Sequence, residues 1–194
     1  MTAPTPRSPA KRLGCPKAAS EAQNRPKLAC ELVTALARLM VGHPDKLASR
    51  VETAGGDLLL FLRSDKSDMG RLIGANGIIH RSLVAVGDEI ALTGFELMKI
   101  EEATTNSPAV SVKPWDRSAA ERTLRRVLDA MFNSDYLLTW SDTDRISIVS
   151  ITVGSGFESD RILVVYEKLK VILNAIAQAH GRYFRLSLRE GVVA

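Results

Sequence analysis

The chain has 194 residues, a net charge of +4 and a 45% share of hydrophobic residues. That length and composition allow one sizeable core or two small ones. Two cysteines, Cys15 and Cys30, are too few for a disulfide scaffold and favour a reducing, cytoplasmic setting. No apolar run approaches the length of a membrane span, and the N-terminus has no apolar signal core, so we expect no membrane association.

The charge is distributed unevenly along the chain. Residues 1–27 carry six Lys and Arg against one Glu, whereas residues 28–103 carry eight against eleven Asp and Glu. The remaining residues carry twelve against ten. The basic excess therefore lies in the first residues and in the second half, which argues against a strongly basic surface on the first folded unit.

Residues 1–26 hold five prolines and almost no large apolar side chains. Such a segment cannot bury enough surface to offset the entropy lost on ordering, so it is predicted to be a disordered basic tail. It is either a weak electrostatic arm for RNA or a solvated tail. An organelle transit peptide is a further alternative, against which the missing amphipathic stripe counts.

Apolar periodicity predicts an α+β unit over residues 27–103. Helical spacing covers residues 28–41, and Gly42 and Pro44 end that helix. Gly55-Gly56-Asp57 indicates a hairpin between two strands. The expected elements that follow the first helix are strands at 47–53 and 57–63, a short helix at 68–73, a helix from 78 to about 92, and a strand at 95–100.

The turn Gly74-Ala75-Asn76-Gly77 lies between the last two of these helices. Two glycines three positions apart let the backbone turn sharply and let a ligand approach closely. The helix that starts at Ile78 directs its unpaired N–H groups and the positive end of its dipole toward the turn. This arrangement is typical of a phosphate-binding site, although the G-x-x-G spacing alone occurs readily by chance.

The element order and a longer motif resemble a type II KH domain, in which a G-x-x-G loop joins two helices packed on one face of a three-stranded sheet. The similarity is greatest to the small single-KH RNA-binding proteins of bacteria, the KhpA type. Two segments carry it: Val41-Gly42-His43-Pro44-Asp45 at the first helix stop, and Asp68-Met69-Gly70-Arg71-Leu72-Ile73-Gly74-Ala75-Asn76-Gly77. The resemblance covers residues 28–103.

The resemblance implies that the loop clamps the backbone of single-stranded RNA while a neighbouring apolar groove receives the bases. The residues that it assigns to RNA binding are Arg71, Ile73, Gly74, Ala75, Asn76, Gly77, Ile78, Ile79, His80 and Arg81. The alternative roles are a plain turn for the glycines, core packing for the isoleucines and a surface position for His80. The two variable loop positions usually include a cation, whereas here they are neutral, so weak RNA binding by this unit alone is expected.

The second half repeats the element order. After a linker at 104–116, a second α+β unit is predicted at 117–190, starting with a helix to residue 132 whose capping box pairs Ser118 with Glu121. Strands at 135–140 and 145–153, a helix from 160 to about 179 and a strand at 183–188 follow. An offset of about 86 residues aligns the two apolar patterns, which suggests a duplicated KH-like unit without its G-x-x-G loop. The alternative is an unrelated α+β domain.

The sequence offers no catalytic constellation. It has no H-x-x-H, C-x-x-C, P-loop or nucleophile-elbow pattern, and its three histidines occur in unrelated contexts. We therefore expect no catalysis and no cofactor, metal or small-molecule substrate. The resemblance to KH domains implies a non-catalytic RNA-binding protein that acts as an RNA chaperone or post-transcriptional regulator. The alternative is an interaction module that forms a homodimer or binds a KH-protein partner and has little RNA affinity. Trp115 and Trp140 are expected in the core or an interface.

Overall fold

The structure, a computed structural model, describes residues 16–92, 94–103, 114–133, 135–154 and 159–191. It has mixed α+β architecture, as predicted. The first unit consists of α1 (Pro16–Met40), β1 (Ala48–Ala54), β2 (Asp57–Ser64), the 3-10 turn η1 (Lys66–Asp68), α2 (Met69–Ile73), the 3-10 turn η2 (Ala75–Gly77), α3 (Ile78–Ala91) and β3 (Phe95–Glu102). The second consists of α4 (Arg117–Phe132), β4 (Tyr136–Asp142), β5 (Ile146–Val153), α5 (Ser159–Ala179) and β6 (Tyr183–Glu190).

Each unit contains one three-stranded sheet with the same topology. In the first, β2 lies in the middle, antiparallel to β1 and parallel to β3. In the second, β5 lies in the middle, antiparallel to β4 and parallel to β6. The antiparallel pairs are hairpins, and each parallel pair is connected through a helix, as a parallel crossover requires. The strand positions predicted from the sequence are confirmed to within two residues at each end.

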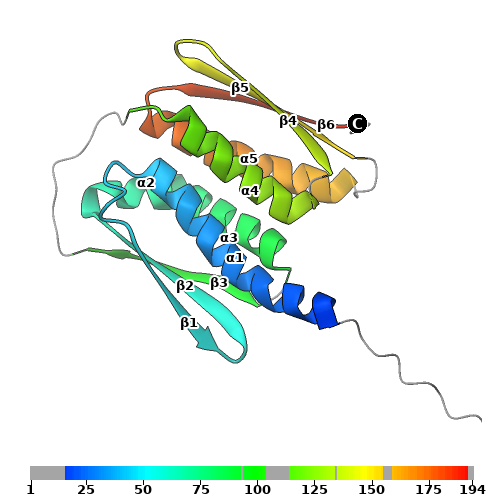
Figure 1. Ribbon diagram of the computed structural model, residues 1–194. Helices are drawn as coiled ribbons and strands as arrows, with labels where there is room; N and C mark the ends of the chain where they lie inside the picture. Colours follow the sequence, from blue (N-terminus) through cyan, green and yellow to red (C-terminus); the bar gives the residue numbers. More distant parts are fainter. Residues whose placement is uncertain (1–15, 93, 104–113, 134, 155–158, 192–194) are drawn as a thin grey trace, which may run out of the picture.

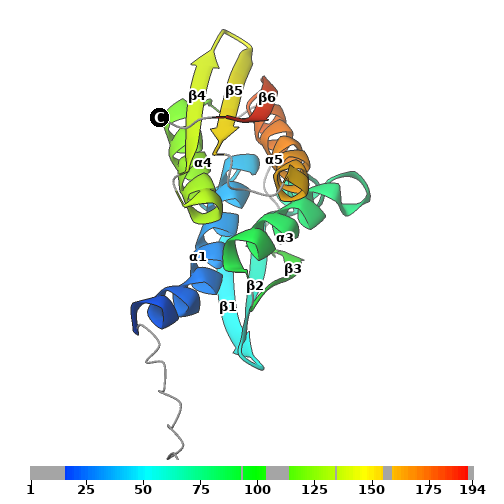
Figure 2. The same ribbon diagram turned by 90° about the vertical axis from the view of Figure 1, so that its right-hand side faces the viewer.

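The helices lie between the two sheets (Figures 1 and 2). One face of each sheet is buried against them, through Leu60 and Leu62 of β2 and through Val149 and Ile151 of β5. The helices of the two units also contact one another, since α3 and α1 pack on α5 and α1 packs on α4. The buried residues of both units form a single hydrophobic cluster, so the opposite face of each sheet points outward.

The two units correspond in detail around α3 and α5. Leu83 and its predicted counterpart Leu169 are both buried, whereas Ile78 and Val164 are 45% and 50% exposed. Val164 continues the apolar spacing of α5 but is half-exposed, so it does not belong to the buried face of that helix. Where the first unit turns at Gly74–Gly77, α5 continues without a break. These features agree with an internal duplication, which stays a prediction.

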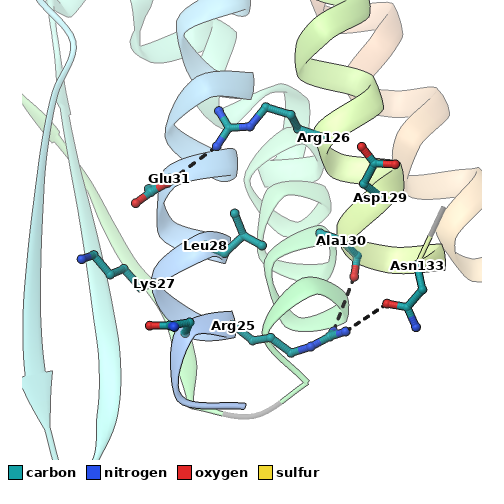
Figure 3. A pocket seen from close by; sticks show the side chains of 9 residues that line it. Arg25, Lys27, Leu28, Glu31, Arg126, Asp129, Ala130 and Asn133 are labelled. Atoms are coloured by element: carbon teal, nitrogen blue, oxygen red, sulfur yellow. Dashed lines mark hydrogen bonds and ion pairs between the residues drawn. The ribbon is translucent and has the colours of Figure 1, made fainter. Parts of the chain in front are cut away.

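The first helix begins at Pro16, within the segment predicted to be a disordered tail up to residue 26. Arg25, in the third turn of α1, lies in this segment and contacts residues of both units, two of which Figure 3 shows. The Arg25 guanidinium donates hydrogen bonds to the backbone carbonyls of Ile90, at 3.2 Å, and Ala130, at 3.4 Å, and to Asn133 Oδ1, at 3.4 Å. These partners are far away in sequence, so local composition could not indicate that this part of the helix is tied to both units. Residues 1–15 lie outside the described residues.

The start of α4 also differs from the prediction. Asp116 caps the helix, and its carboxylate accepts a hydrogen bond from the Ala119 N–H at 2.9 Å. The predicted capping box of Ser118 and Glu121 is therefore wrong, and Glu121 pairs with arginines of the same helix instead. The N-cap thus lies two residues before Ser118, and the Asp116 side chain satisfies one of the orphan N–H groups of the first turn. Of the predicted linker, residues 104–113 lie outside the described residues.

Both tryptophans belong to a polar hub in the second unit, around Asp142. The indole N–H groups of Trp115 and Trp140 donate to the Asp142 carboxylate at 3.2 and 3.0 Å, and Arg182 Nη2 lies 3.6 Å from it. Burial by itself raises the pKa of Asp142, but hydrogen bonds from Ser147, Trp140 and Trp115 outweigh it and hold the pKa below its usual value. Trp140 is buried, as expected for a core residue.

This hub makes the second unit sensitive to acid. Because the pKa of Asp142 is lower in the folded than in the unfolded chain, its contribution to stability is present at neutral pH and lost as pH falls through the folded value. Asp142→Asn should lower the free energy of unfolding at neutral pH by about 1–3 kcal/mol. The deficit should shrink toward pH 3 in urea unfolding followed by tryptophan fluorescence. The control is Asp144→Asn at an exposed position of the same hairpin, and an equal deficit there would contradict the role of the hub.

Tight packing of α3 on β3 gives a further prediction. A Cβ atom at Gly87 would lie 2.1 Å from the Phe95 ring, whereas one at Gly70 would meet no atom within 4 Å. Gly87→Ala should therefore lower the free energy of unfolding by about 1–3 kcal/mol through overpacking. Gly70→Ala should be neutral or stabilise by up to about 1 kcal/mol, since alanine favours the helix. Urea unfolding measures both variants, and equal stabilities would contradict the packing.

Candidate nucleic-acid interface

The glycine loop is built by two short turns between β2 and α3. Asp65 ends β2 and caps η1, where its carboxylate accepts hydrogen bonds from the Ser67 N–H at 3.1 Å and the Ser67 hydroxyl at 2.9 Å. The five residues of α2 follow, and η2 leads directly into α3. Because Gly77 is the N-cap of α3 and has no side chain, the first N–H groups of that helix receive no side-chain cap from it.

Both glycines of the loop are required by the turn itself. Gly74 and Gly77 both have a φ of +72°. Residues with an L side chain rarely adopt such a positive φ. A Cβ atom at Gly74 would also lie 2.7 Å from Ile79 Cγ1 and 3.1 Å from the Ile79 backbone nitrogen. The turn therefore accounts for the glycines whether or not a ligand approaches them.

Asp68 connects the two segments that carry the family resemblance. Its buried carboxylate accepts hydrogen bonds from the backbone N–H groups of Gly42, at 2.8 Å, and His43, at 3.0 Å. His43 Nδ1 lies 3.1 Å from the same carboxylate, and Arg71 Nη1 lies 3.5 Å from it. The end of α1 is thereby fixed to the start of α2, so the position of the loop depends on this one carboxylate.

The loop itself is open to solvent. Ala75 and Asn76 are exposed, and Asn76 has a left-handed φ of +52°. The two arginines that were expected to reach phosphates have partners within the protein. Arg81 Nη1 donates to the Asn76 carbonyl at 2.6 Å, and Arg71 pairs with Asp68. A guanidinium carries five N–H donors, so one contact does not exhaust Arg81.

A pocket of about 430 Å³ lies between this loop and α5 of the second unit. Of the residues predicted to bind RNA, those that line it are Arg71, Gly74, Ala75, Ile78 and Ile79; those that do not are Ile73, Asn76, Gly77, His80 and Arg81. Its other wall is formed by α5 and includes Asn174 and Gln178. These two amides lie one turn apart and are exposed. Sequence reasoning missed them, because only the fold brings α5 to the loop.

A larger hollow, of about 790 Å³, lies between α1 and α4. Figure 3 shows one ion pair across it, in which Arg126 Nη2 lies 3.7 Å from Glu31 Oε2, while Arg25 donates to the neutral oxygens of Ala130 and Asn133. Its walls carry both signs of charge, so it does not resemble a site for a polyanion.

The described residues contain no group of three or more His, Cys, Asp or Glu that could hold a metal ion. Burial raises the pKa of the Cys30 thiol to about 11, so this cysteine stays protonated at neutral pH and is a poor nucleophile. In the part of the chain that the structure describes, no helix combines the length and apolar character needed to cross a bilayer.

Comparisons of the chain with protein-family models, with curated proteins and with solved structures found no match. The resemblance to KH domains therefore rests on the sequence segments around Val41–Asp45 and Asp68–Gly77.

The Asp68 contacts give a stability prediction. Asp68→Asn should lower the free energy of unfolding by about 1.5–3 kcal/mol, because hydrogen bonds to a charged acceptor are lost or weakened at a buried site. Amide exchange at Gly42 and His43, measured by hydrogen–deuterium exchange, should accelerate. Asp45→Asn, at an exposed position three residues after Gly42, serves as the control. Similar stability losses in the two variants would show that Asp68 has no special role.

Proposed function

We propose that this protein is a non-catalytic, cytoplasmic RNA-binding protein whose glycine loop clamps the backbone of single-stranded RNA, as in type II KH domains. It acts as an RNA chaperone or post-transcriptional regulator. The observation that carries the proposal is the open Gly74–Gly77 loop at the N-terminus of α3, beside a concave pocket. Backbone N–H groups at a helix start are suited to phosphate oxygens, and the pocket lies where a base would follow.

The order of the elements supports the same proposal. The first unit has a three-stranded sheet, and its helices and glycine loop follow the element order that the resemblance to type II domains implies. The pocket is also chemically suited to a base. Ile78 and Ile79 supply apolar contact, while the amides of Asn174 and Gln178 can donate and accept hydrogen bonds at a base edge.

A second candidate function is a protein-interaction or dimerisation module on the same scaffold. It is favoured by the arginines at the loop, since Arg71 and Arg81 are engaged by Asp68 and by the Asn76 carbonyl, and the loop positions Ala75 and Asn76 are neutral. The two functions differ in what the purified protein carries. Co-purifying nucleic acid, seen as a raised ratio of absorbance at 260 to 280 nm, favours RNA binding. A clean protein that elutes as a dimer favours the interaction module.

Two negative charges in the loop test the RNA proposal directly. Ala75→Asp combined with Asn76→Asp should weaken binding to a single-stranded oligoribonucleotide by at least about tenfold in fluorescence anisotropy, because carboxylates would face the phosphates. Both positions are exposed, and Asp tolerates the left-handed conformation at position 76. The matched control is Thr53→Asp with Ala54→Asp, at neighbouring exposed positions of the β1–β2 hairpin. Unchanged binding by the loop variant would remove the loop from the mechanism.

A further inference from the structure

The outward face of the second sheet carries an unusual set of side chains. Alternation along the strands defines this face, called here the outer β4–β6 face, and the register of the ladders aligns its members across the sheet. Its residues are Leu137, Thr139 and Ser141 of β4, Ile146, Ile148, Ser150 and Thr152 of β5, and Tyr183, Arg185, Ser187 and Arg189 of β6. The hydroxyls of Ser187 and Ser150 lie 2.8 Å apart, which confirms that these strands present the same face.

The large apolar members of this face are open to solvent. Tyr183 is 71% exposed, Leu137 53%, Ile146 42% and Ile148 37%. No other described element covers them, because α4 and α5 lie on the opposite side of the sheet (Figures 1 and 2). Tyr183, Ile146 and Ile148 lie together at one end of the face, whereas Leu137 lies at the other end, opposite Thr152. An exposed cluster of one aromatic and two aliphatic side chains on an open sheet indicates a binding face rather than a solvated one.

The charge of this face identifies the partner. The charged side chains of this face are those of Arg185 and Arg189, and both are exposed. None of the residues that define the face carries a carboxylate. The remaining polar side chains are hydroxyls, which donate hydrogen bonds to phosphate oxygens as readily as to water. A second copy of the chain would bring arginines against arginines, since the face offers no acid to itself.

The outward face of the first sheet provides the contrast. There, basic and acidic side chains are mixed and pair with each other, as in the ion pairs of Arg50 with Glu52 and of Lys99 with Glu101. Glu96 adds a further carboxylate on the same face, opposite Leu59. The two sheets share one topology, so the absence of acids from the outer β4–β6 face is not a consequence of the fold.

We propose that the outer β4–β6 face is a second binding surface for single-stranded RNA, distinct from the glycine loop. Tyr183, at the start of β6, stacks on a base, and Ile146, its neighbour across the ladder, packs beside that base. Arg185 and Arg189, four residues and about 13 Å apart along the strand, contact successive parts of the phosphate backbone. A duplex presents neither unstacked bases nor a flat backbone to such a sheet, so the preference is for single strands.

The test uses the full chain and a fluorescein-labelled oligouridylate, with binding followed by anisotropy over a range of KCl concentrations. Arg185→Gln combined with Arg189→Gln should weaken binding by about fivefold for each lost phosphate contact at moderate salt. The slope of log affinity against log salt should also become shallower by about 1.4. The matched control, Arg63→Gln with Lys99→Gln, removes the same charge from the first sheet and should change the affinity by less than about twofold.

Tyr183 provides an independent measurement. Tyr183→Ala should weaken binding by at least about fivefold, whereas Tyr183→Phe should retain it, because stacking needs the ring and not the hydroxyl. Thermal unfolding followed by circular dichroism verifies that each variant is folded. Equal affinities for Tyr183→Ala and wild type, or equal losses in the Arg185/Arg189 and Arg63/Lys99 variants, would overturn the proposal.

The remaining outcomes separate this surface from the loop and from other partners. Loss of binding in the Ala75/Asn76 variant with none in the sheet variants would support the loop and overturn the sheet proposal. Loss of binding in the sheet variants, with unchanged binding in the Ala75/Asn76 variant, would support the sheet proposal and overturn the proposed role of the loop. A dimer in sedimentation equilibrium that the Arg185/Arg189 variant dissociates, with oligouridylate binding unchanged, would show an interface between copies and overturn the proposal. Failure of the wild type to bind the oligonucleotide would overturn both.

Discussion

The packing of the two helix layers against each other determines which surfaces the protein leaves open. Helix α1 is buried on most of its circumference, through Leu32, Val33, Leu36 and Ala37, because it contacts its own sheet and also α4 and α5. A unit with only one of these neighbours would expose an apolar helix face. With the helices enclosed, what remains for recognition is the rim where α2, α3 and α5 meet and the outward faces of the two sheets (Figure 1).

The elements that were predicted correctly are those specified by local patterns. Alternation in β5 and the helical spacing of Leu83, Val86 and Ile90 in α3 depend on which side of one element is buried, and that periodicity is written in the sequence. The part of α1 that was predicted as tail includes Arg25, which contacts the carbonyls of Ile90 and Ala130, and no local window contains those partners. Val164 shows the reverse: it fits the apolar spacing of α5, yet it stays half-exposed.

Some features of the candidate site could be predicted from the sequence, and others could not. The glycines at 74 and 77 were recognisable because both have a positive φ that other residues rarely adopt, and at Gly74 a Cβ atom would also collide with Ile79. The pairing of Arg71 with Asp68 could not be derived, since it requires the carboxylate to be already fixed by the Gly42 and His43 N–H groups. The wall supplied by α5 carried no signal in the sequence, because two exposed amides one turn apart on a helix are ordinary until a second element faces them.

The two proposed surfaces complement each other in charge. The loop offers backbone N–H groups and an apolar pocket but few free cations, which limits the electrostatic part of its affinity. The outer β4–β6 face offers guanidinium groups and an exposed ring, and two of its residues, Ser187 and Arg189, line a hollow of about 500 Å³ beside α5. A strand held at both would gain effective concentration at the second site once bound at the first. The absence of a glycine loop from the second unit is then compatible with RNA binding, because α5, running unbroken, forms a wall of one surface and supports the sheet of the other.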